Sequence, residues 1–365
     1  MLCDWLPPDF GAVGQYALAH ARDLAGQGNH VALVGFSATQ ASEVDESIGE
    51  GTLRVRRLHR RIYDRTKWLR RAFWTVGANV RLLWGARREL RRADEVQFTG
   101  SPPYLLHFVM PLALLLRRRT RYRITDFHPE CLMAAMQHVP WWLRAIGQVT
   151  WFWRRRVDVI EVLGEDQRTR LAPGGVDPSR VELRRDPSPV EFGPNVHAAA
   201  IPEGLRGQRV ILYSGNWGVA HDHRTFVEGF ALFCAAHPRR AGLWLNATGG
   251  RADLVAAELA ARSLPHVRTL PVPLAALPSV LLAADVHLIT LDDPFVGYVL
   301  PSKVYACIAS GRPVLFVGPE SSDVHSLCAA SLGPARYRRV DVGDAPALCA
   351  ALESLLALQP AGHGK

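Results

Sequence analysis

The stretch that says most about the fold reads Tyr-Val-Leu-Pro-Ser-Lys-Val-Tyr-Ala-Cys-Ile-Ala-Ser-Gly-Arg-Pro-Val-Leu and spans residues 298–315. Pro301 and Ser302 are typical of a helix start, with Ser302 or its neighbour as the cap, and Gly311–Pro313 is typical of a helix end that leads into a strand. Lys303 then falls in the first turn, where the helix dipole disfavours a cation. A bound anion, held by free backbone N–H groups and the ammonium together, would remove that penalty. The segment therefore predicts a helix–strand unit with a phosphate site.

Segments of strand and helix length alternate along the rest of the chain. Short apolar runs of strand length fall at His30–Phe36, Glu95–Thr99, Tyr122–Thr125, Val157–Val162, Val210–Ser214, Leu243–Ala247, Val286–Leu291 and Val314–Val317. Helix-length segments fall at Gly14–Gln27, Tyr104–Arg118, Trp141–Arg155, Arg224–Ala236, Ala252–Ser263, Leu274–Ala284 and Ser302–Ser310. Such alternation predicts parallel sheets covered by helices on both faces, and so an α/β protein.

Length and composition indicate two domains. The 365 residues are enough for two cores, and the hydrophobic content of 48% excludes a generally disordered chain. Arg185–Gln208 holds four prolines and few large apolar residues, which is typical of a linker. We therefore expect a first domain over residues 1–195 and a second over residues 205–343, with the boundary near residue 200.

The cysteines and the apolar runs bear on the cellular compartment. The six cysteines are scattered, without a CxxC pair or the His/Cys spacing of a zinc site. We therefore expect a reduced, cytoplasmic protein that holds no metal. The longest apolar run, Tyr104–Leu116, is interrupted by His107 and Pro111 and is too short to span a bilayer.

The excess of positive charge is concentrated in one segment. The chain carries a formal charge of +9, and Arg54–Arg123 alone holds nineteen cations against four carboxylates, about +15. Aromatic residues such as Trp68, Phe73 and Trp84 are interleaved with these cations. A basic, aromatic, amphipathic stretch favours a surface that meets anionic lipid or a phosphorylated acceptor. Nucleic acid binding and an ordinary solvated helix face are the alternatives.

Lysine is rare in this chain. Only three of the 43 Lys and Arg residues are lysines, namely Lys67, Lys303 and Lys365. A GC-rich genome is the simple explanation. Where mutation so strongly favours arginine, an interior lysine is expected to be retained for a chemical role. The rarity of lysine therefore supports the predicted site at Lys303.

Three loops could bind a ligand besides the segment around Lys303. Asp4–Gly14 is rich in proline and glycine and leads into a helix, so its backbone N–H groups can approach an anion, although a plain tight turn is the alternative. Thr125–Glu130 follows a strand, at the edge where open α/β sheets bind ligands. There Asp126 and His128 could orient hydroxyls or share a proton, or Asp126 could simply cap a helix beside a surface histidine.

The third loop, Tyr213–Asp222, opens a buried strand into a glycine turn before a helix. Its backbone forms a second cradle at a carboxyl end, into which Asn216 and His221 are candidate hydrogen-bond donors. The alternative is a structural turn capped by Asp222.

These four segments together resemble the family 4 retaining glycosyltransferases of the GT-B fold. The resemblance rests above all on Pro301-Ser302-Lys303 through Gly311-Arg312-Pro313, covers nearly the whole chain in the right order, and is strongest to members that make cell-surface polysaccharides. It implies two Rossmann-like, doubly wound domains facing a central cleft, with the acceptor mainly on the first domain and a nucleotide-sugar mainly on the second. It also implies that the segment 344–365 packs back on the first domain.

The resemblance assigns roles to individual residues. Gly11 and Gly14 would approach the phosphate and sugar of the donor, and Gly215 would do so from the other domain. Lys303 would neutralise the diphosphate leaving group, where negative charge grows in the transition state. Asp126 or His128 would lie by the transferred sugar. The family retains anomeric configuration and needs no metal or other cofactor for transfer.

The chain departs from the family pattern at several positions. Asn216 and His221 stand where many members carry Arg and Lys for the diphosphate. Tyr298 and Ala306 correspond to two glutamates, so recognition of a ribose by a carboxylate is not expected. Only three residues precede Asp4, whereas the family's first strand is normally longer, which favours a start upstream.

We therefore expect a cytoplasmic enzyme, peripheral on the inner face of the plasma membrane, that transfers a sugar from a nucleotide-diphosphate donor to a carbohydrate or lipid-linked acceptor. The donor-binding residues are expected to be Gly11, Gly14, Gly215, Asn216, His221, Tyr298, Ser302 and Lys303. An anionic membrane is the expected partner of Arg54–Arg123, and nucleic acid is not. Two alternatives remain: a non-catalytic partner subunit, favoured by Asn216 and Ala306, and a nucleotide-sugar epimerase on the same fold.

Overall fold

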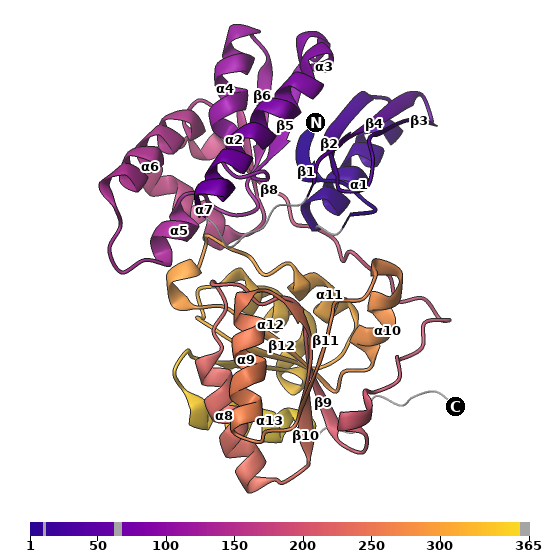
Figure 1. The fold of residues 1–365 in the computed structure, drawn as a ribbon, viewed down its shortest axis with the longest axis vertical. Helices are drawn as coiled ribbons and strands as arrows, with labels where there is room; N and C mark the ends of the chain where they lie inside the picture. Colours follow the sequence, from indigo (N-terminus) through magenta and orange to yellow (C-terminus); the bar gives the residue numbers. More distant parts are fainter. Residues whose placement is uncertain (10–11, 62–67, 358–365) are drawn as a thin grey trace. The chain divides into compact units, whose positions relative to one another are not determined.

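The computed structural model describes residues 1–9, 12–61 and 68–357 and divides the chain into two compact units, Met1–Arg185 and Asp186–Lys365 (Figure 1). Each unit is a sheet with helices against it, so the fold is α/β, as the alternation of segments predicts. The division falls before the proline-rich stretch rather than inside it.

The first domain is built on an eight-stranded sheet with the order β3-β4-β2-β1-β5-β6-β7-β8. Its strands are β1 (Leu2–Trp5), β2 (His30–Ser37), β3 (Ser42–Ile48), β4 (Gly51–His59), β5 (Glu95–Thr99), β6 (Arg119–Arg123), β7 (Val159–Val162) and β8 (Val181–Leu183). The β3–β4 pair is antiparallel and the remaining pairs are parallel. The carboxyl ends of β1 and β6 therefore reach the same edge of the sheet.

Seven helices accompany that sheet within the described residues: α1 (Ala12–Gly26), α2 (Trp68–Gly85), α3 (Arg87–Arg92), α4 (Leu106–Leu115), α5 (Glu130–Ala134), α6 (Trp141–Arg154) and α7 (Glu165–Leu171). Short 3-10 turns follow at Ala172–Gly174 and Pro178–Arg180. Helix α1 packs on β1, β2 and β4, and its residues Ala17, Ala21 and Ala25 form a core with Leu33 and Leu53. Small side chains on α1 let the helix lie close to the strands.

The second domain is built on a six-stranded parallel sheet with the order β11-β10-β9-β12-β13-β14. Its strands are β9 (Arg209–Asn216), β10 (Ala241–Thr248), β11 (His266–Thr269), β12 (Val286–Thr290), β13 (Val314–Val317) and β14 (Tyr337–Val340). Its helices are α8 (Arg224–Ala236), α9 (Gly250–Ala261), α10 (Leu277–Leu282), α11 (Lys303–Ala309), α12 (Asp323–Arg336) and α13 (Ala345–Leu356), with 3-10 turns at Glu203–Leu205, Leu274–Ala276 and Asp293–Phe295.

The last helix corrects an expectation. Helix α13 packs on α8, β13 and β14, and its residues Leu348, Leu352 and Leu355 are fully buried in the core of the second domain. Burying three leucines removes a large apolar area from water, which holds the helix where it is. The expectation that the segment 344–365 packs back on the first domain is therefore wrong for Ala345–Leu356, and residues 358–365 lie outside the described residues.

The proline-rich stretch belongs to the second domain. Val190 and Leu205 are buried in a core cluster with Val210 and Leu212 of β9, and Ile201 packs against the same cluster. These apolar contacts explain why the division falls at Arg185 and Asp186, ahead of the expected limits at residues 195 and 205.

Candidate functional site

Glycine 14 is required by the packing of the first domain. A Cβ at Gly14 would lie 2.8 Å from the carbonyl carbon of Trp5 and closer still to its oxygen, so no other residue fits where α1 crosses the end of β1. This contact accounts for Gly14 without a ligand. Gly11 lies outside the described residues, and the donor-binding role of both glycines stays a prediction.

Asp126 lies just beyond the carboxyl end of β6. Burial, together with the nearby carboxylate of Asp4 on β1, raises the pKa of Asp126 to about 6. The structure thus brings two carboxyl groups into electrostatic contact at one sheet edge. A carboxyl group with this pKa can hold or release a proton near neutral pH, which suits a group that orients sugar hydroxyls. Asp4 was not among the predicted site residues.

A buried ion pair fixes the turn that carries Asp126 and His128. Arg154 of α6 has no exposed surface and donates to both carboxylate oxygens of Glu130, with Nη1–Oε1 at 2.5 Å and Nη2–Oε2 at 3.0 Å. Its Nη2 also donates to the carbonyl oxygen of His128 at 3.1 Å. The guanidinium lies over the rings of Phe127 and Trp151, at 4.8 and 4.7 Å from their centroids.

Arg154 is a positioning residue that sequence reasoning missed, although a signal for it existed. Leu143, Gly147 and Thr150 are the other buried residues of α6, and Arg154 continues their spacing of four, three and four residues. An arginine in the buried register of a helix requires a buried acidic partner. The sequence does not say which acid this is, because Glu130 lies 24 residues away.

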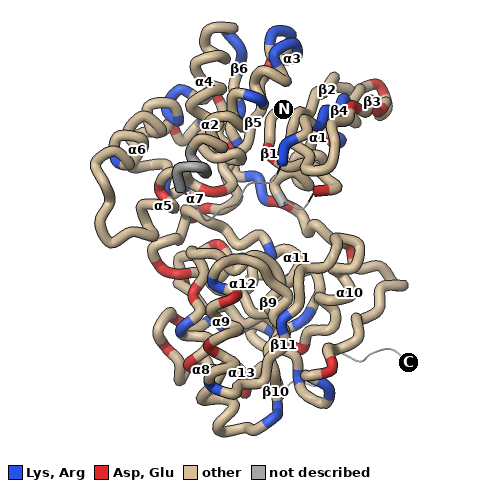
Figure 2. The backbone as a smooth tube through the Cα atoms, viewed as in Figure 1, with Lys and Arg blue, Asp and Glu red and all other residues tan. Residues whose placement is uncertain are grey.

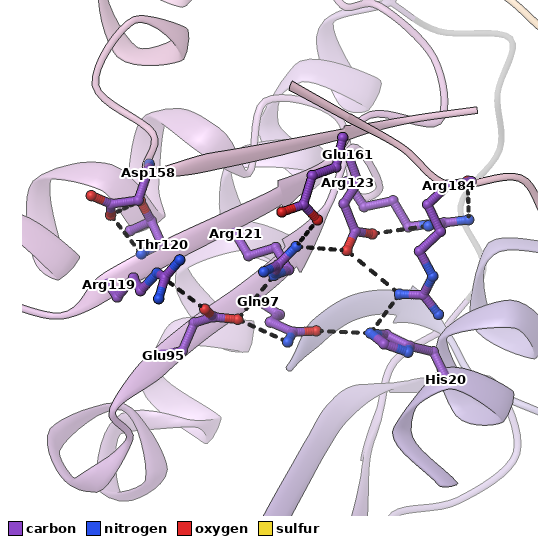
Figure 3. Close-up of polar contacts among 11 residues, drawn as sticks. His20, Glu95, Gln97, Arg119, Thr120, Arg121, Arg123, Asp158, Glu161 and Arg184 are labelled. Atoms are coloured by element: carbon purple, nitrogen blue, oxygen red, sulfur yellow. Dashed lines mark hydrogen bonds and ion pairs between the residues drawn. The ribbon is translucent and has the colours of Figure 1, made fainter. Parts of the chain in front are cut away.

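A second charged network joins the sheet of the first domain to α1 (Figure 3). Glu161 of β7 is almost fully buried and accepts from Arg121 at 3.2 Å and from Arg123 at 2.9 Å. Arg184 lies 2.6 Å from Nε2 of His20, which in turn lies 3.2 Å from Oε1 of Gln97. Burial and the Arg184 charge lower the pKa of His20 to about 4, so the imidazole is neutral at pH 7.

This network borders a cavity of about 1320 Å³ whose lining includes the first residues of β2 and β5, His30 and Glu95. Open α/β sheets bind ligands at the opposite, carboxyl ends of their strands. Arg121 and Glu161 in the lining also pair with each other. The size of this cavity therefore does not make it the candidate site.

In the second domain the structure brings Gly215 and Lys303 together. The Nζ of Lys303 lies 3.1 Å from the centroid of the Tyr213 ring, which stacks on Trp217 at 3.8 Å. Gly215 has a φ of +125°, and a Cβ there would lie 3.6 Å from Cε and 3.8 Å from Nζ of Lys303. The strand end at Gly215 and the first residue of α11 thus form one site, with an aromatic floor beneath the ammonium.

The ammonium of Lys303 is buried without an anionic partner. Its Nζ has no hydrogen-bond partner among the described residues. Burial lowers the pKa of Lys303 to about 7. The Tyr213 ring offsets part of the lost hydration, since a cation on a ring contributes about 2 kcal/mol when desolvated. The site is therefore prepared for an anion that the protein itself does not supply.

His221 lies near Lys303, but its N–H group donates within the protein and not into the predicted ligand loop. Its Nδ1 lies 2.6 Å from the carbonyl oxygen of Thr290, so Nδ1 carries the hydrogen and Nε2 is left as an acceptor. Burial, followed by the charge of Lys303, lowers the pKa of His221 to about 3. A neutral imidazole in this tautomer adds no positive charge and no second N–H donor for a phosphate.

The other predicted donor-site residues lie around the same strand end. Asn216 ends β9, and its carbonyl oxygen accepts from the Tyr213 hydroxyl at 3.2 Å. Tyr298 is half-buried in the turn before α11, and its N–H donates to the Phe295 carbonyl at 2.9 Å. Ser302 precedes α11 as predicted, but its hydroxyl makes no capping bond, because its own backbone is already helical at φ −58° and ψ −19°.

Arg251 is a cation beside this site that the sequence did not reveal. It lies in the first turn of α9, directly after Gly249 and Gly250, and donates to the carbonyl oxygen of His221. It also pairs with Asp292 at 2.8 Å. The glycine turn before it resembles the other ligand loops and was the available signal. Because Asp292 neutralises Arg251, Arg251 adds no free positive charge beside Lys303.

Across the described ranges, 1–9, 12–61 and 68–357, no group of three or more His, Cys, Asp or Glu side chains is arranged to hold a metal ion.

Comparison with solved structures shows the fold of both domains. A trehalose-6-phosphate protein of E. coli bound with UDP-2-fluoro glucose matches with a TM-score of 0.64 and 14% identity over 99% of this chain and 91% of that chain. Sucrose-phosphate synthase of Thermosynechococcus elongatus matches with a TM-score of 0.64 and 15% identity over 98% and 89%. Anabaena HepE in complex with UDP and glucose matches with a TM-score of 0.63 and 11% identity over 97% and 88%.

The chain thus has the GT-B fold, with two Rossmann-like α/β domains, as the sequence resemblance implies. No protein-family model matches the sequence, and no curated protein matches it. At identities of 10–15%, the likeness concerns the fold, and the activity has to be argued from the site.

The buried pair in the first domain makes a prediction about stability. Arg154→Met should destabilise that domain by about 3–5 kcal/mol, because it leaves the Glu130 carboxylate buried and uncompensated. The double variant Arg154→Met/Glu130→Met should recover most of this loss. Urea unfolding monitored by tryptophan fluorescence measures both. A single-variant loss below about 1 kcal/mol would contradict the assigned role.

Substitution of Lys303, unlike that of Arg154, is expected to stabilise the unliganded protein. A lysine whose folded pKa is depressed destabilises the native state at low pH, and this effect fades as the pH rises from about 7 towards the unfolded value of 10.5. Lys303→Met should therefore raise the Tm of the unliganded protein by about 2 °C or more at pH 6.5. The gain should shrink by pH 9.5. Arg262→Met, which removes the exposed, Glu258-paired cation directly after α9, is the matched control in calorimetry. A lower Tm for Lys303→Met at pH 6.5 would refute the prediction.

Proposed function

We propose that this protein is a glycosyltransferase that moves a sugar from a nucleotide-diphosphate sugar to a carbohydrate or lipid-linked acceptor with retention of configuration. The observation that carries the proposal is the buried, unpartnered ammonium of Lys303 beneath Gly215. A diphosphate placed there pairs with the ammonium and occupies a position where charge develops as the leaving group departs. The fold supports the proposal, because the matching HepE structures hold UDP or UDP-glucose.

The proposed chemistry needs little from side chains beyond the second domain's cation. Lys303 stabilises the diphosphate as the bond to the sugar breaks, and the acceptor attacks from the face that the leaving group vacates. Asp126, with its pKa near 6, orients hydroxyls of the transferred sugar, and His128 on the same turn supports it. Gly11, Gly14, Asn216, His221, Tyr298 and Ser302 surround the donor in this proposal. The step requires no metal or cofactor.

A biological setting follows as part of the same proposal. The resemblance to enzymes of cell-surface polysaccharide synthesis favours that pathway class and a cytoplasmic position on the inner face of the plasma membrane.

A non-catalytic partner subunit is the second candidate. His221 is neutral and Arg251 pairs with Asp292, so neither of these two residues of the second domain adds a free positive charge for the diphosphate. A weaker donor site of this kind suits a subunit that binds and stabilises another enzyme. This candidate would be favoured if a nucleotide-sugar binds but its sugar is neither transferred to an acceptor nor slowly released by hydrolysis.

A binding screen tests the proposed function. UDP, GDP, ADP and dTDP sugars are added to the purified protein, and donor affinity is measured by thermal shift and calorimetry. At least one donor should bind, and Lys303→Met should weaken it tenfold or more, which corresponds to about 1.4 kcal/mol. Arg262→Met should bind as the parent does.

Two outcomes of the screen would count against the account. Binding by no donor would overturn the enzyme proposal. Equal binding by the parent and Lys303→Met would overturn the role of Lys303. Where a donor binds, the anomeric configuration of the product, followed by NMR, tests retention.

A further inference from the structure

Among the described residues, the positive charge of Arg54–Arg123 is divided between strands and helices. Most arginines on the strands are paired with carboxylates of the first domain: Arg54 contacts Asp45 at 2.8 Å, and Arg121 contacts Glu95 at 3.1 Å. Further pairs join Arg56 to Glu43 and Glu89, Arg119 to Glu95, and Arg123 to Glu161. A surface that binds a membrane would therefore lie on the helices of the first domain.

Helix α2 exposes a continuous apolar stripe. Phe73, Val76, Val80 and Trp84 follow one another at spacings of three, four and four residues, so they lie on one face of the helix. All four are exposed, Phe73 to 76% and Trp84 to 69%. A stripe that faces the core would instead be buried. This face of α2 is therefore not part of the core of the first domain and is open to a partner.

Helices α4 and α6 add to this face. On α6, Trp141, Val149 and Phe152 share a face at spacings of eight and three, with Trp141 exposed to 80%. Trp142 is exposed beside them, and Leu114 and Leu115 are exposed at the end of α4, Leu115 to 80%. Large side chains of this kind are normally buried, and several on neighbouring helices mark an interaction surface.

The three helices are neighbours. Helix α4 packs against both α2 and α6, as the upper part of Figure 1 shows. His107 of α4 lies 2.9 Å from the Thr150 hydroxyl of α6, and the Asn79 amide of α2 donates to the carbonyl oxygen of Pro103, just before α4, at 3.0 Å. The helices that carry the exposed apolar side chains are therefore neighbours in the first domain, and we term their exposed side the α2–α4–α6 face.

The charges on the α2–α4–α6 face have one sign. Helices α2, α4 and α6 contain no Asp or Glu (Figure 2). Arg87 lies over the Trp84 ring at 4.8 Å, and Arg156 lies over the Phe152 ring at 3.6 Å, so cations accompany the exposed aromatics. Further exposed cations on or beside the three helices are Arg81, Arg88, Arg117 and Arg144.

We propose that the α2–α4–α6 face docks the protein on an anionic phospholipid bilayer. Exposed tryptophans and phenylalanines partition to the headgroup level, and the surrounding arginines attract anionic headgroups. A second copy of the chain is a poorer occupant, since two such faces would bring arginines against arginines without a carboxylate on the helices. No helix in the described part of the chain has the length and apolar character to cross a membrane.

Vesicle co-sedimentation tests this proposal without a donor. The protein should bind vesicles of 70% phosphatidylcholine and 30% phosphatidylglycerol at least tenfold more tightly than pure phosphatidylcholine at about 0.05 M salt, and less tightly at about 0.5 M salt, where the Debye length falls below about 5 Å. Trp84→Ser/Trp141→Ser should weaken binding to the anionic vesicles at least tenfold. Arg81→Glu/Arg88→Glu should weaken it at least fivefold.

Matched variants in the second domain serve as controls. Leu254→Ser, at an exposed leucine of α9, and Arg262→Glu, at the Glu258-paired residue directly after that helix, should bind vesicles as the parent does. Far-ultraviolet circular dichroism and Tm establish that each variant is folded. Because donor binding is not part of the readout, the docking proposal and the proposed function stand or fall separately.

Three results would overturn the docking proposal. The first is absence of binding to anionic vesicles at low salt. The second is unchanged binding by both double variants. The third is concentration-dependent dimerisation, seen by light scattering without lipid and abolished by Trp84→Ser/Trp141→Ser, which would assign the face to a second copy.

Discussion

The desolvation of one ammonium is the constraint on which the second domain's site depends. Burial of a charge is tolerated only where the surroundings compensate it or where function keeps the penalty in place. At Lys303 the surroundings compensate in part: the Tyr213 ring beneath Nζ, itself stacked on Trp217, supplies a polarisable floor. Gly215 lies above with a backbone conformation that other residues rarely adopt. The protein itself supplies no anionic partner for Nζ among the described residues. In the proposed function the diphosphate of the donor is that partner, and the unliganded fold bears the cost of the buried charge.

The first domain compensates its buried charges with partners of its own. Its buried charges are paired internally, Arg154 with Glu130 and Glu161 with several arginines, so they shape the structure rather than await a ligand. The Arg154–Glu130 pair fixes the turn that carries Asp126 and His128. Arg154 belongs to a helix that contacts this turn although it is distant from it in the sequence. In each domain the carboxyl ends of the strands carry the candidate chemistry, whereas several charged residues that line the cavity at the amino ends of the strands pair with one another.

Local patterns predicted much of this fold. The segments Glu95–Thr99, Arg224–Ala236 and Val314–Val317 have the predicted bounds, because each is apolar, short and flanked by clear stop signals. Strand β6 lies at Arg119–Arg123 rather than Tyr122–Thr125, since arginines alternate with inward residues and hide the strand from an apolar search. The hairpin β3–β4 was missed because β3 is polar, with three carboxylates and mostly exposed residues, and because arginines interrupt the apolar residues of β4. Long-range pairings such as Arg154 with Glu130, Arg251 with Asp292 and α13 with α8 have no local signature. Lys303, by contrast, was predicted from its own helix turn, and the structure places it at the first residue of α11.

The central claim is that the Lys303 ammonium awaits the diphosphate of a donor, and proton uptake on binding tests it most directly. Calorimetry of nucleotide-diphosphate binding at pH 8, in two buffers of different ionisation enthalpy, measures the protons exchanged. Because the unliganded pKa is about 7 and an anion raises it, binding should take up close to one proton, and affinity should fall by up to tenfold per pH unit above 7. Lys303→Gln should take up none. Binding by the parent protein with no proton uptake at pH 8 would contradict the claim.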